Sequence, residues 1–504
     1  MTPTAMGLSA LDIAVIVVYL AGVTLFGLRF RKRQRTLRDY FLADKAIPWW
    51  AIALSIVAAE TSTLTIISVP GLAYEHDFRF LQLVFGYLVG RVAICVLLIP
   101  HYFRGELVTA YQLIERRFGQ RLRSLTAGLF LLTRAAAEGV RVFAVAIVVR
   151  IALGGMLSGL SDFGRDLAAI GIVTLLTLIY TFEGGMAAVI WTDVVQLIIY
   201  LSGTLVGVFT LVHLVPGGWG TIASVASSAG KFRLLDFSFN FSAPYTFWSG
   251  VIGGAFLTTA SHGTDQLIVQ RLLSARSERQ SKVALLVSGV AVLAQFALFL
   301  LIGAMLYAFY RQNAPEQAFT RTDTIFPTFI VTRMPHGISG LLLSAILAAA
   351  MSNLSAALNS LSSTSIVDFY SRIRPESTEA RRVQLSRVAT LFWGVMLFAL
   401  AIAARHGGRV LEVGLSIASV AYGSLLGVFL LGVLTRRATE SGAMVGMLCG
   451  FVLNVYLWQG THVPFAWYVP LGSIVTFAIG YTASMFTAAS TDHEHVQVDV
   501  EKSR

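Results

Sequence analysis

The sequence predicts an all-α integral membrane protein, and three observations carry this prediction. Of the 504 residues, 56% are hydrophobic and only 13% are charged, with a mean hydropathy of +0.72, a balance foreign to soluble domains. About thirteen apolar stretches are long enough to cross a bilayer. Two of them are interrupted by polar residues and glycines, as in transporter helices that unwind around a binding site. The predicted spans are roughly 11–28, 49–74, 79–100, 123–152, 166–182, 187–214, 246–271, 283–310, 340–370, 385–404, 410–435, 441–459 and 466–486.

The placement of charge predicts how the chain is oriented. The net charge is +11, but the basic residues lie in short loops at span ends, which fits the positive-inside rule and argues against nucleic-acid binding. The first span is preceded by no positive charge and followed by a basic loop between Arg29 and Arg38. We therefore expect a retained span with the N-terminus outside and, given about thirteen spans, a cytoplasmic C-terminus. Cys95 and Cys449 both lie in apolar spans, which argues against a disulfide framework or a cysteine-based metal cluster.

The second span carries a carboxylate at membrane depth. Glu60 lies in its middle, among the hydroxyl side chains of residues 61–63 and Thr65. A charge at this depth is unfavourable unless it faces a partner or a water-filled cavity. Two interpretations stay open, a group that faces solute or ion, and one half of an ion pair with an arginine that holds two helices together.

The seventh span is interrupted in a similar way. Its glycines and polar residues are Gly250, Gly253, Gly254, Gly263, Ser261, His262, Thr264, Asp265 and Gln266. The two interrupted spans are five apart, so five-span units that start at them run in opposite senses. This pattern predicts an inverted-repeat transporter with its site near the membrane midplane. The expected divisions are an extra span and basic loop (1–48), a first repeat (49–214), an extracellular loop (215–245), a second repeat (246–435), two further spans (436–489) and a cytoplasmic tail (490–504).

The ninth span, residues 341–370, is rich in oxygen-bearing side chains. Ser352, Ser355, Asn359 and Ser362 recur at three- and four-residue steps, so a helix places them in one stripe. Na⁺ is a hard cation that prefers such oxygens to soft ligands. The stripe is also compatible with a helix interface of small residues, in which hydroxyls bond the preceding turn.

Two other spans contain charges. Arg134, Glu138 and Arg141 lie on one face of the fourth span, either as functional groups or as an internal ion-pair clip. Asp193 follows the Gly184-Gly185 corner with no cation within a helical turn in sequence. A buried carboxylate there requires a proton, a metal ion or a distant arginine.

Four long motifs resemble those of one known family. They are GGMAAVIWTDVVQ (184–196), GTDQLIVQRLLSARS (263–277), SAILAAAMSNLSAALNSLSSTSIVDFY (344–370) and LLGVFLLGVLTRRAT (425–439). The chain resembles the sodium:solute symporters over nearly its whole length. The resemblance implies the LeuT-type fold, two inverted five-helix repeats with one extra N-terminal and two extra C-terminal helices. It also implies Na⁺ as the coupling ion, no other cofactor, a monomeric functional unit and a place in the plasma (inner) membrane.

The resemblance also implies a main sodium site. Its ligands correspond to the backbone carbonyls of Ala58, Thr61 and Ala349 and to the side chains of Ser352 and Asn353. Asn353 is a departure, because the family usually has Ser or Thr at this position. Its amide oxygen still ligates Na⁺ but is less exactly placed.

A second cation or proton site and a substrate site follow from the same resemblance. Asp193 and Ser355 match the second site, although Ala356 replaces one expected hydroxyl. The substrate positions correspond to Glu60, Ser62, Thr65, Gln82, Arg141, Ser261, His262 and Tyr422.

The expected function is therefore Na⁺-coupled symport of a small polar organic solute by alternating access. Sugars, sialic-acid-like solutes, carboxylates and amino acids all suit this mixed set of side chains. A proton-coupled symporter of the same fold, using Asp193 or Glu60, is the alternative. A channel and an intramembrane enzyme are remote alternatives, because the sequence has no repeated filter motif, no His-Glu-x-x-His and no nucleophile elbow.

Overall fold

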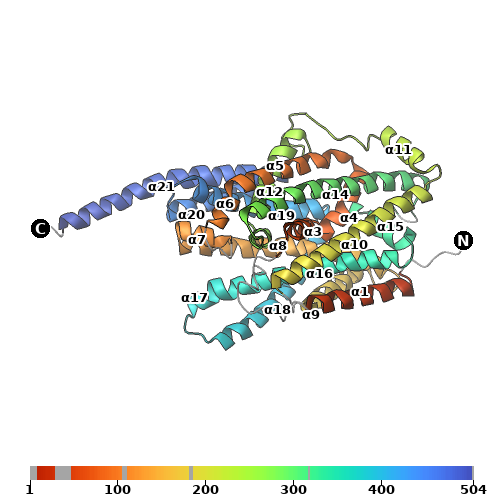
Figure 1. Cartoon of the computed structure of the whole chain (residues 1–504), viewed down its shortest axis with the longest axis horizontal. Helices are drawn as coiled ribbons and strands as arrows, with labels where there is room; N and C mark the ends of the chain where they lie inside the picture. Colours follow the sequence, from red (N-terminus) through yellow and green to blue (C-terminus); the bar gives the residue numbers. More distant parts are fainter. Residues whose placement is uncertain (1–7, 29–46, 105–109, 181–184, 316–317, 502–504) are drawn as a thin grey trace.

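The computed structural model describes residues 8–28, 47–104, 110–180, 185–315 and 318–501. The basic loop expected after the first span, from Arg29 to Arg38, and Gly184 of the Gly-Gly corner lie outside the described residues. The described part is almost entirely helical, and its only β-type contact is an isolated bridge between Ile47 and Ala275. Most long helices run along one direction, and the two chain ends lie at opposite ends of the molecule (Figure 1).

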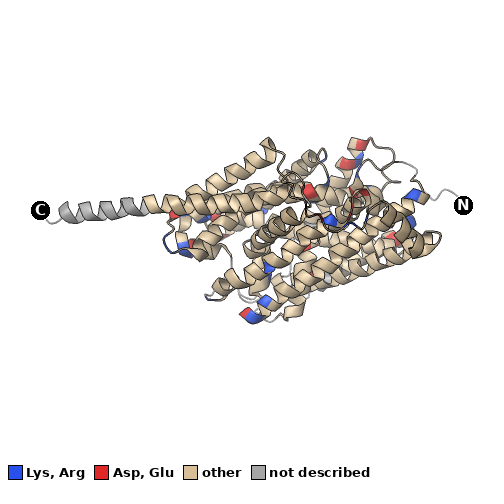
Figure 2. Cartoon of the chain, turned by 90° about the horizontal axis from the view of Figure 1, so that it is seen from above, with Lys and Arg blue, Asp and Glu red and all other residues tan. Residues whose placement is uncertain are grey.

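Every predicted span coincides with a helix or a helix pair. The long elements are α1 (Ala10–Leu28), α3 (Trp49–Glu60), α4 (Thr63–Glu75), α5 (Leu81–Leu97), α8 (Gln120–Ala152), α9 (Asp162–Tyr180), α10 (Gly185–Leu214), α12 (Phe247–Gly263), α13 (Gln266–Leu273), α14 (Glu278–Gln312), α16 (Ile338–Thr364), α18 (Glu379–Ala404), α19 (Val410–Leu434), α20 (Glu440–Gly460) and α21 (Tyr468–Glu501). Within the described residues, eight helices are long and apolar enough to cross a membrane, and the bent pair α3–α4 makes a ninth. Charged residues are sparse along these helices (Figure 2).

Short elements connect the spans. They are the helices α6 (Ile99–Phe103), α7 (Tyr111–Phe118), α11 (Gly218–Ser228), α15 (Ile325–Arg333) and α17 (Ser371–Ile373), and the 3₁₀ turns η3 (Phe78–Phe80), η4 (Thr322–Thr324) and η6 (Phe465–Trp467). The π-helical η5 (Ser365–Tyr370) continues α16.

Both predicted helix interruptions are confirmed. The axes of α3 and α4 differ by 64°, because Ser62 is extended (φ −78°, ψ 170°) and ends the helical path. In the seventh span, α12 ends at Gly263 and α13 starts at Gln266. Asp265 caps α13 by accepting a 2.9 Å hydrogen bond from the Leu267 N–H.

Glycine allows α5 and α12 to pack backbone to backbone. A Cβ on Gly254 would lie 2.1 Å from the Leu83 carbonyl oxygen, so no larger residue fits there. The seventh span is thereby held directly against α5, next to the interruption that follows it.

The extra N-terminal helix is attached through a buried carboxylate. Asp12 of α1 accepts hydrogen bonds from the Gly337 and Gly340 N–H groups, at 2.6 and 3.1 Å, at the start of α16. These N–H groups have no partner within the helix, and the helix dipole favours a negative charge beside them. Asp12 therefore fixes α1 against the helix that carries the polar stripe.

Candidate functional site

The interruption between α3 and α4 diverts the backbone hydrogen bonds of two predicted sodium ligands. A continuous helix would direct the Ser62 N–H to the Ala58 carbonyl and the Thr65 N–H to the Thr61 carbonyl. Instead the Ser62 N–H bonds the Glu60 carbonyl at 3.0 Å, and the Thr65 N–H bonds the Ser62 carbonyl at 2.9 Å. The carbonyls of Ala58 and Thr61 are thus released from these helical bonds.

Side chains hold this interruption in place. The Thr61 hydroxyl donates to the Val57 carbonyl at 2.8 Å and accepts a hydrogen bond from Nε2 of Gln295 in α14. The Thr65 hydroxyl donates to the Glu60 carbonyl at 3.3 Å. Gln295 is missing from the sequence prediction, although a buried amide in an otherwise apolar span was a usable signal.

A cavity of about 220 Å³ lies beside the interruption, between α4, α8 and α16. Its lining residues are Ser62, Thr63, Arg141, Val145, Ala350, Asn353 and Leu354. The structure thereby brings together three predicted site residues from distant parts of the sequence, Ser62, Arg141 and Asn353. The Thr63 hydroxyl is buried and has no hydrogen-bond partner within the described part of the chain.

The predicted ion-ligating stripe lies on α16, which packs against α4, α8 and α10. Asn353 reaches the cavity, while Ala349 and Ser355 are buried and Ser352 is half-buried. Ser355 makes a polar interaction of its own. The helix therefore places the Asn353 amide at the cavity and the hydroxyls of Ser352 and Ser355 within one helical turn of it in sequence.

Glu60 belongs to a buried cluster with partners from α5 and α12. Its carboxylate forms an ion pair with Arg91, a side chain with 0% exposure, and lies 3.3 Å from Nε2 of His262. Nδ1 of His262 lies 2.8 Å from the Ser261 hydroxyl. Of the two interpretations left open for Glu60, the geometry is that of a helix-holding ion pair. Arg91 is missing from the sequence prediction, but a lone arginine within the apolar third span was the available signal.

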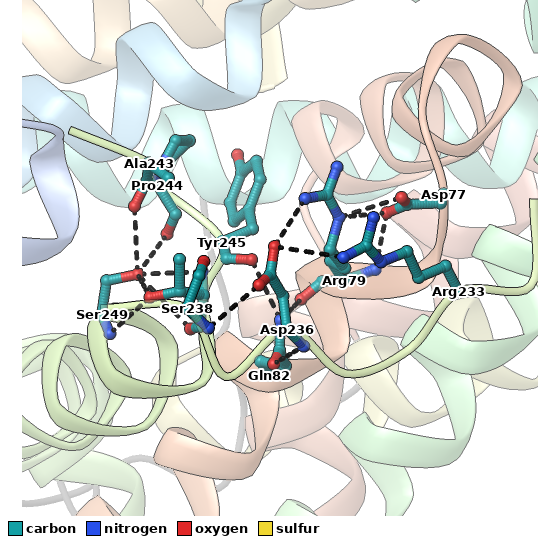
Figure 3. A network of polar contacts seen from close by, with 11 residues as sticks. Asp77, Arg79, Gln82, Arg233, Asp236, Ser238, Ala243, Pro244, Tyr245 and Ser249 are labelled. Atoms are coloured by element: carbon teal, nitrogen blue, oxygen red, sulfur yellow. Dashed lines mark hydrogen bonds and ion pairs between the residues drawn. The ribbon is translucent and has the colours of Figure 1, made fainter. Parts of the chain in front are cut away.

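Gln82 and Tyr422 lie away from the cavity lined by Arg141. The Gln82 amide donates to the Tyr245 carbonyl at 3.0 Å and accepts from the Asp236 N–H at 2.9 Å, so it is bound to the segment that precedes α12 (Figure 3). The Tyr422 hydroxyl donates to Asp265 at 2.9 Å. Tyr422 and Asp265 line a second cavity of about 350 Å³, together with Tyr111 and Phe130.

Arg134, Glu138 and Arg141 form the internal clip that their spacing allows. The Glu138 carboxylate is fully buried, 2.6 Å from Arg141 and 3.0 Å from Arg134. Arg134 also lies 3.6 Å from Asp265. Arg141 keeps 30% of its side chain exposed and still lines the cavity, so the clip and a cavity-facing guanidinium coexist.

Asp193 is paired with a distant arginine. Its carboxylate accepts from the Ser55 hydroxyl at 2.6 Å and from Nη2 of Arg271 in α13 at 2.9 Å. Nε of Arg271 also donates to the Ser55 oxygen at 2.9 Å, which closes a buried triangle of α3, α10 and α13. The arginine was one of the three partners that the sequence left open for this carboxylate.

The N-terminal end of α19 is linked to the end of α4 by a polar cluster. Arg409 lies 2.5 Å from Glu75 and 2.7 Å from Nε2 of His76, and Tyr245 donates to Glu412 at 2.6 Å. Burial and the nearby Arg409 lower the pKa of His76, so its imidazole is neutral at pH 7. These contacts fasten the ends of α4 and α19 together.

Two broken helices five spans apart, with a small polar cavity beside one break, define a secondary transporter with its site inside the membrane. The family model of the sodium:solute symporter family matches residues 40–450. The chain belongs to this family.

Relatives and solved structures agree with this assignment. The chain is 30% identical to the sodium/sialic acid symporter SiaT of Proteus mirabilis, over 95% of this chain and 96% of that protein. It is 27% identical to the human sodium/iodide cotransporter, over 89% of this chain and 69% of that protein. A substrate-bound, outward-open Na⁺-coupled sialic acid symporter superposes with a TM-score of 0.82 at 28% identity, covering 95% of this chain and 98% of that one. The transporter Mhp1 shares the fold alone, with a TM-score of 0.54 at 12% identity, covering 89% of this chain and 94% of that one.

The predicted fold and function class are confirmed by these findings. The chain is a multi-pass membrane protein and a sodium-coupled solute symporter, not an enzyme. Transporters of this family use sodium as the coupling ion and need no other cofactor.

Proposed function

We propose that the transported solute is a small polar anion whose negative group is bound by Arg141. The observation that carries this proposal is that Arg141 lines the 220 Å³ cavity together with Ser62, Thr63 and Asn353. A guanidinium can bind a carboxylate through two parallel hydrogen bonds, and hydroxyl and amide groups suit the remaining polar atoms of the solute.

Glu138 partly neutralises the positive charge of Arg141 in the cavity. Its carboxylate lies 2.6 Å from Arg141, so the guanidinium is partly neutralised before the solute arrives. An anion that binds must therefore compete with Glu138, and a neutral polyol is the second candidate that this contact favours. In this proposal the cluster of Glu60, His262 and Ser261 supports the α3–α4 interruption. A supporting role through hydrogen bonds is also proposed for Thr65, Gln82 and Tyr422.

The coupling Na⁺ is proposed to bind between the interruption and α16. The ligands are the carbonyls of Ala58, Thr61 and Ala349 with the side chains of Ser352 and Asn353. The diverted hydrogen bonds at the interruption support the two α3 carbonyls as ligands. Asp193 and Ser355 form the path by which the cation leaves, and the path opens when Asp193 exchanges Arg271 for the ion.

The topology belongs to the same proposal. The protein works as a monomer in the plasma (inner) membrane, with its N-terminus outside and its C-terminus in the cytoplasm. Residues 49–214 and 246–435 form the two inverted repeats. The start of α1 and the end of α21 lie at opposite ends of the molecule (Figure 1), and the basic residues of the sequence lie in the loops predicted to be cytoplasmic; both observations support this orientation.

The proposal is tested by counterflow in proteoliposomes with an inward Na⁺ gradient. A panel of radiolabelled hydroxy- and amino-carboxylates is compared with neutral polyols of equal size. Arg141→Lys keeps the positive charge but loses the paired N–H donors of the guanidinium. We therefore expect the half-saturating solute concentration to rise about tenfold, which corresponds to a loss of about 1.4 kcal/mol in binding free energy. Arg381→Lys, at an exposed arginine in the first turn of α18, is the matched control and should behave as the wild type. Counterflow of neutral polyols but of no carboxylate by the wild type, or an unchanged half-saturating carboxylate concentration in Arg141→Lys, would refute an anionic solute bound by Arg141.

A further inference from the structure

The segment before α12 presents a row of exposed aromatic side chains. In residues 235–241, LDFSFNF, apolar and polar residues alternate, and the segment lies outside any helix or strand. Phe237, Phe239 and Phe241 are exposed by 60, 70 and 55% of their surface. A contiguous row of this kind on a protein surface marks a contact with a partner or a membrane.

Polar residues in and before the segment hold the row of phenylalanines in place. Asp236 binds Arg79 at 2.9 Å, and its N–H donates to Gln82, so the segment is fastened to the start of α5 (Figure 3). A hydrogen bond from Ser238 lowers the pKa of Asp236 to about 2, which keeps this carboxylate ionised at neutral pH. Lys231 donates to three carbonyls at the end of α4, at 2.6, 3.1 and 2.9 Å. These contacts hold the backbone of the segment in place, so the phenylalanines stay exposed at a fixed position.

Two tryptophans at the starts of spans contact the row and indicate its depth relative to the membrane. Phe239 lies 6.3 Å from Trp248, the second residue of α12, between ring centroids. Phe241 lies 5.1 Å from Trp467, directly before α21. The Trp248 indole N–H also donates to the Phe237 carbonyl at 3.2 Å. Tryptophans at span ends typically occupy the membrane–water interface.

The row continues into the surfaces of two spans. One helical turn beyond Trp248, Ile252 is exposed on α12, and beyond Trp467 the side chains of Leu471 and Ile474 are exposed on α21. Exposed apolar residues on membrane spans face lipid. Together with the phenylalanine row, these residues give apolar surface on the segment and on both spans. Between the phenylalanines, Ser238 and Asn240 are neutral groups that suit the headgroup region, while the charge of Asp236 is paired with Arg79.

We propose that residues 235–241 lie in the bilayer interface beside the starts of α12 and α21, with Phe237, Phe239 and Phe241 inserted among the lipids. The sequence predicts an extracellular loop here, and the proposal places this part of it in contact with the membrane. The same segment leads to Tyr245, which binds Glu412 of α19, so lipid contact is linked to the ends of α5, α12 and α19. The proposal is independent of which solute is carried.

Electron paramagnetic resonance of nitroxide labels tests the proposal in the full-length protein. Cys95 and Cys449 are replaced by alanine, and single labels are introduced by Phe239→Cys and Asn240→Cys, an aromatic and a polar position next to each other in the segment. Each variant is reconstituted into phosphatidylcholine–phosphatidylglycerol vesicles, and power saturation is measured with oxygen and with a water-soluble nickel complex. Ile474→Cys on α21 serves as the lipid-facing reference.

We expect the label at 239 to collide with oxygen at least threefold more than with nickel, like the label at 474, and the label at 240 to favour nickel. Equal nickel access at 239 and 240 would place the row in water and overturn the proposal. Shielding of both labels from both reagents, with spin–spin broadening lost on dilution into unlabelled protein, would show a second copy covering the row and also overturn it. If Phe239→Cys fails to fold, Phe237→Cys, at the neighbouring exposed phenylalanine, takes its place.

Discussion

Removing Arg91 should destabilise the protein strongly, because it leaves a carboxylate without its main partner. Arg91 is fully buried, and the side chain of Glu60 is only 11% exposed. Arg91→Met preserves apolar bulk but leaves Glu60 with His262 at 3.3 Å as its remaining partner. Breaking a buried ion pair on one side typically costs about 3–5 kcal/mol, and the histidine contact favours the lower end of that range.

The double variant Glu60→Gln with Arg91→Met separates the ion pair from general packing. Because both charges are gone, at least half of the lost free energy of unfolding should return. The matched control is Lys282→Met, in an exposed pair of Lys282 and Glu278 on α14, where about 0.3–0.5 kcal/mol is expected.

The free energies of unfolding are measured by denaturant titration of the purified protein in detergent micelles. We predict that Arg91→Met lowers the free energy of unfolding several times more than Lys282→Met does. If the two variants lose the same amount, the Glu60–Arg91 pair does not hold α3 against α5, and the assignment of Glu60 to this role is refuted.

Three other substitutions test separate parts of the structure. Asn353→Ser restores the ligand usual in the family, so the half-saturating Na⁺ concentration for uptake should fall or stay equal, and a severalfold rise would contradict Asn353 as a ligand. Asp193→Asn should slow turnover and change the Na⁺ dependence while solute binding stays near the wild type, whereas lost folded protein with unchanged kinetics would leave only the pairing with Arg271. Asp12→Ala removes the cap on α16 at Gly340, so we expect a loss of about 1–2 kcal/mol in the free energy of unfolding, with unchanged stability arguing against this attachment.

The sequence predicted the fold well because its signals are local. A glutamate among hydroxyls at 60–65 and glycines at 250–263 mark interrupted helices wherever the other helices lie. The spacing of Arg134, Glu138 and Arg141 also settles their pairing, since residues three and four apart meet on one helix face.

The sequence could not supply the partners that come from other helices. Arg91 pairs with Glu60 from 31 residues away, and Gln295 reaches Thr61 from 234 residues away. Such contacts depend on how each helix is rotated about its axis, which apolar spans leave undetermined when both faces are buried. Gln82 illustrates the reverse, because its position in the chain suggested the substrate site while its amide binds backbone groups of the segment before α12.

We propose that a sodium gradient drives solute uptake through a site between the α3–α4 interruption and α16. The most direct measurement is solute accumulation in proteoliposomes under an inward Na⁺ gradient at equal pH, and under an inward proton gradient without Na⁺, for the wild type and Ser352→Ala. We predict accumulation by the wild type only with the Na⁺ gradient, and at least a severalfold higher half-saturating Na⁺ concentration for Ser352→Ala. Accumulation driven by the proton gradient alone, or wild-type Na⁺ dependence in Ser352→Ala, would contradict it.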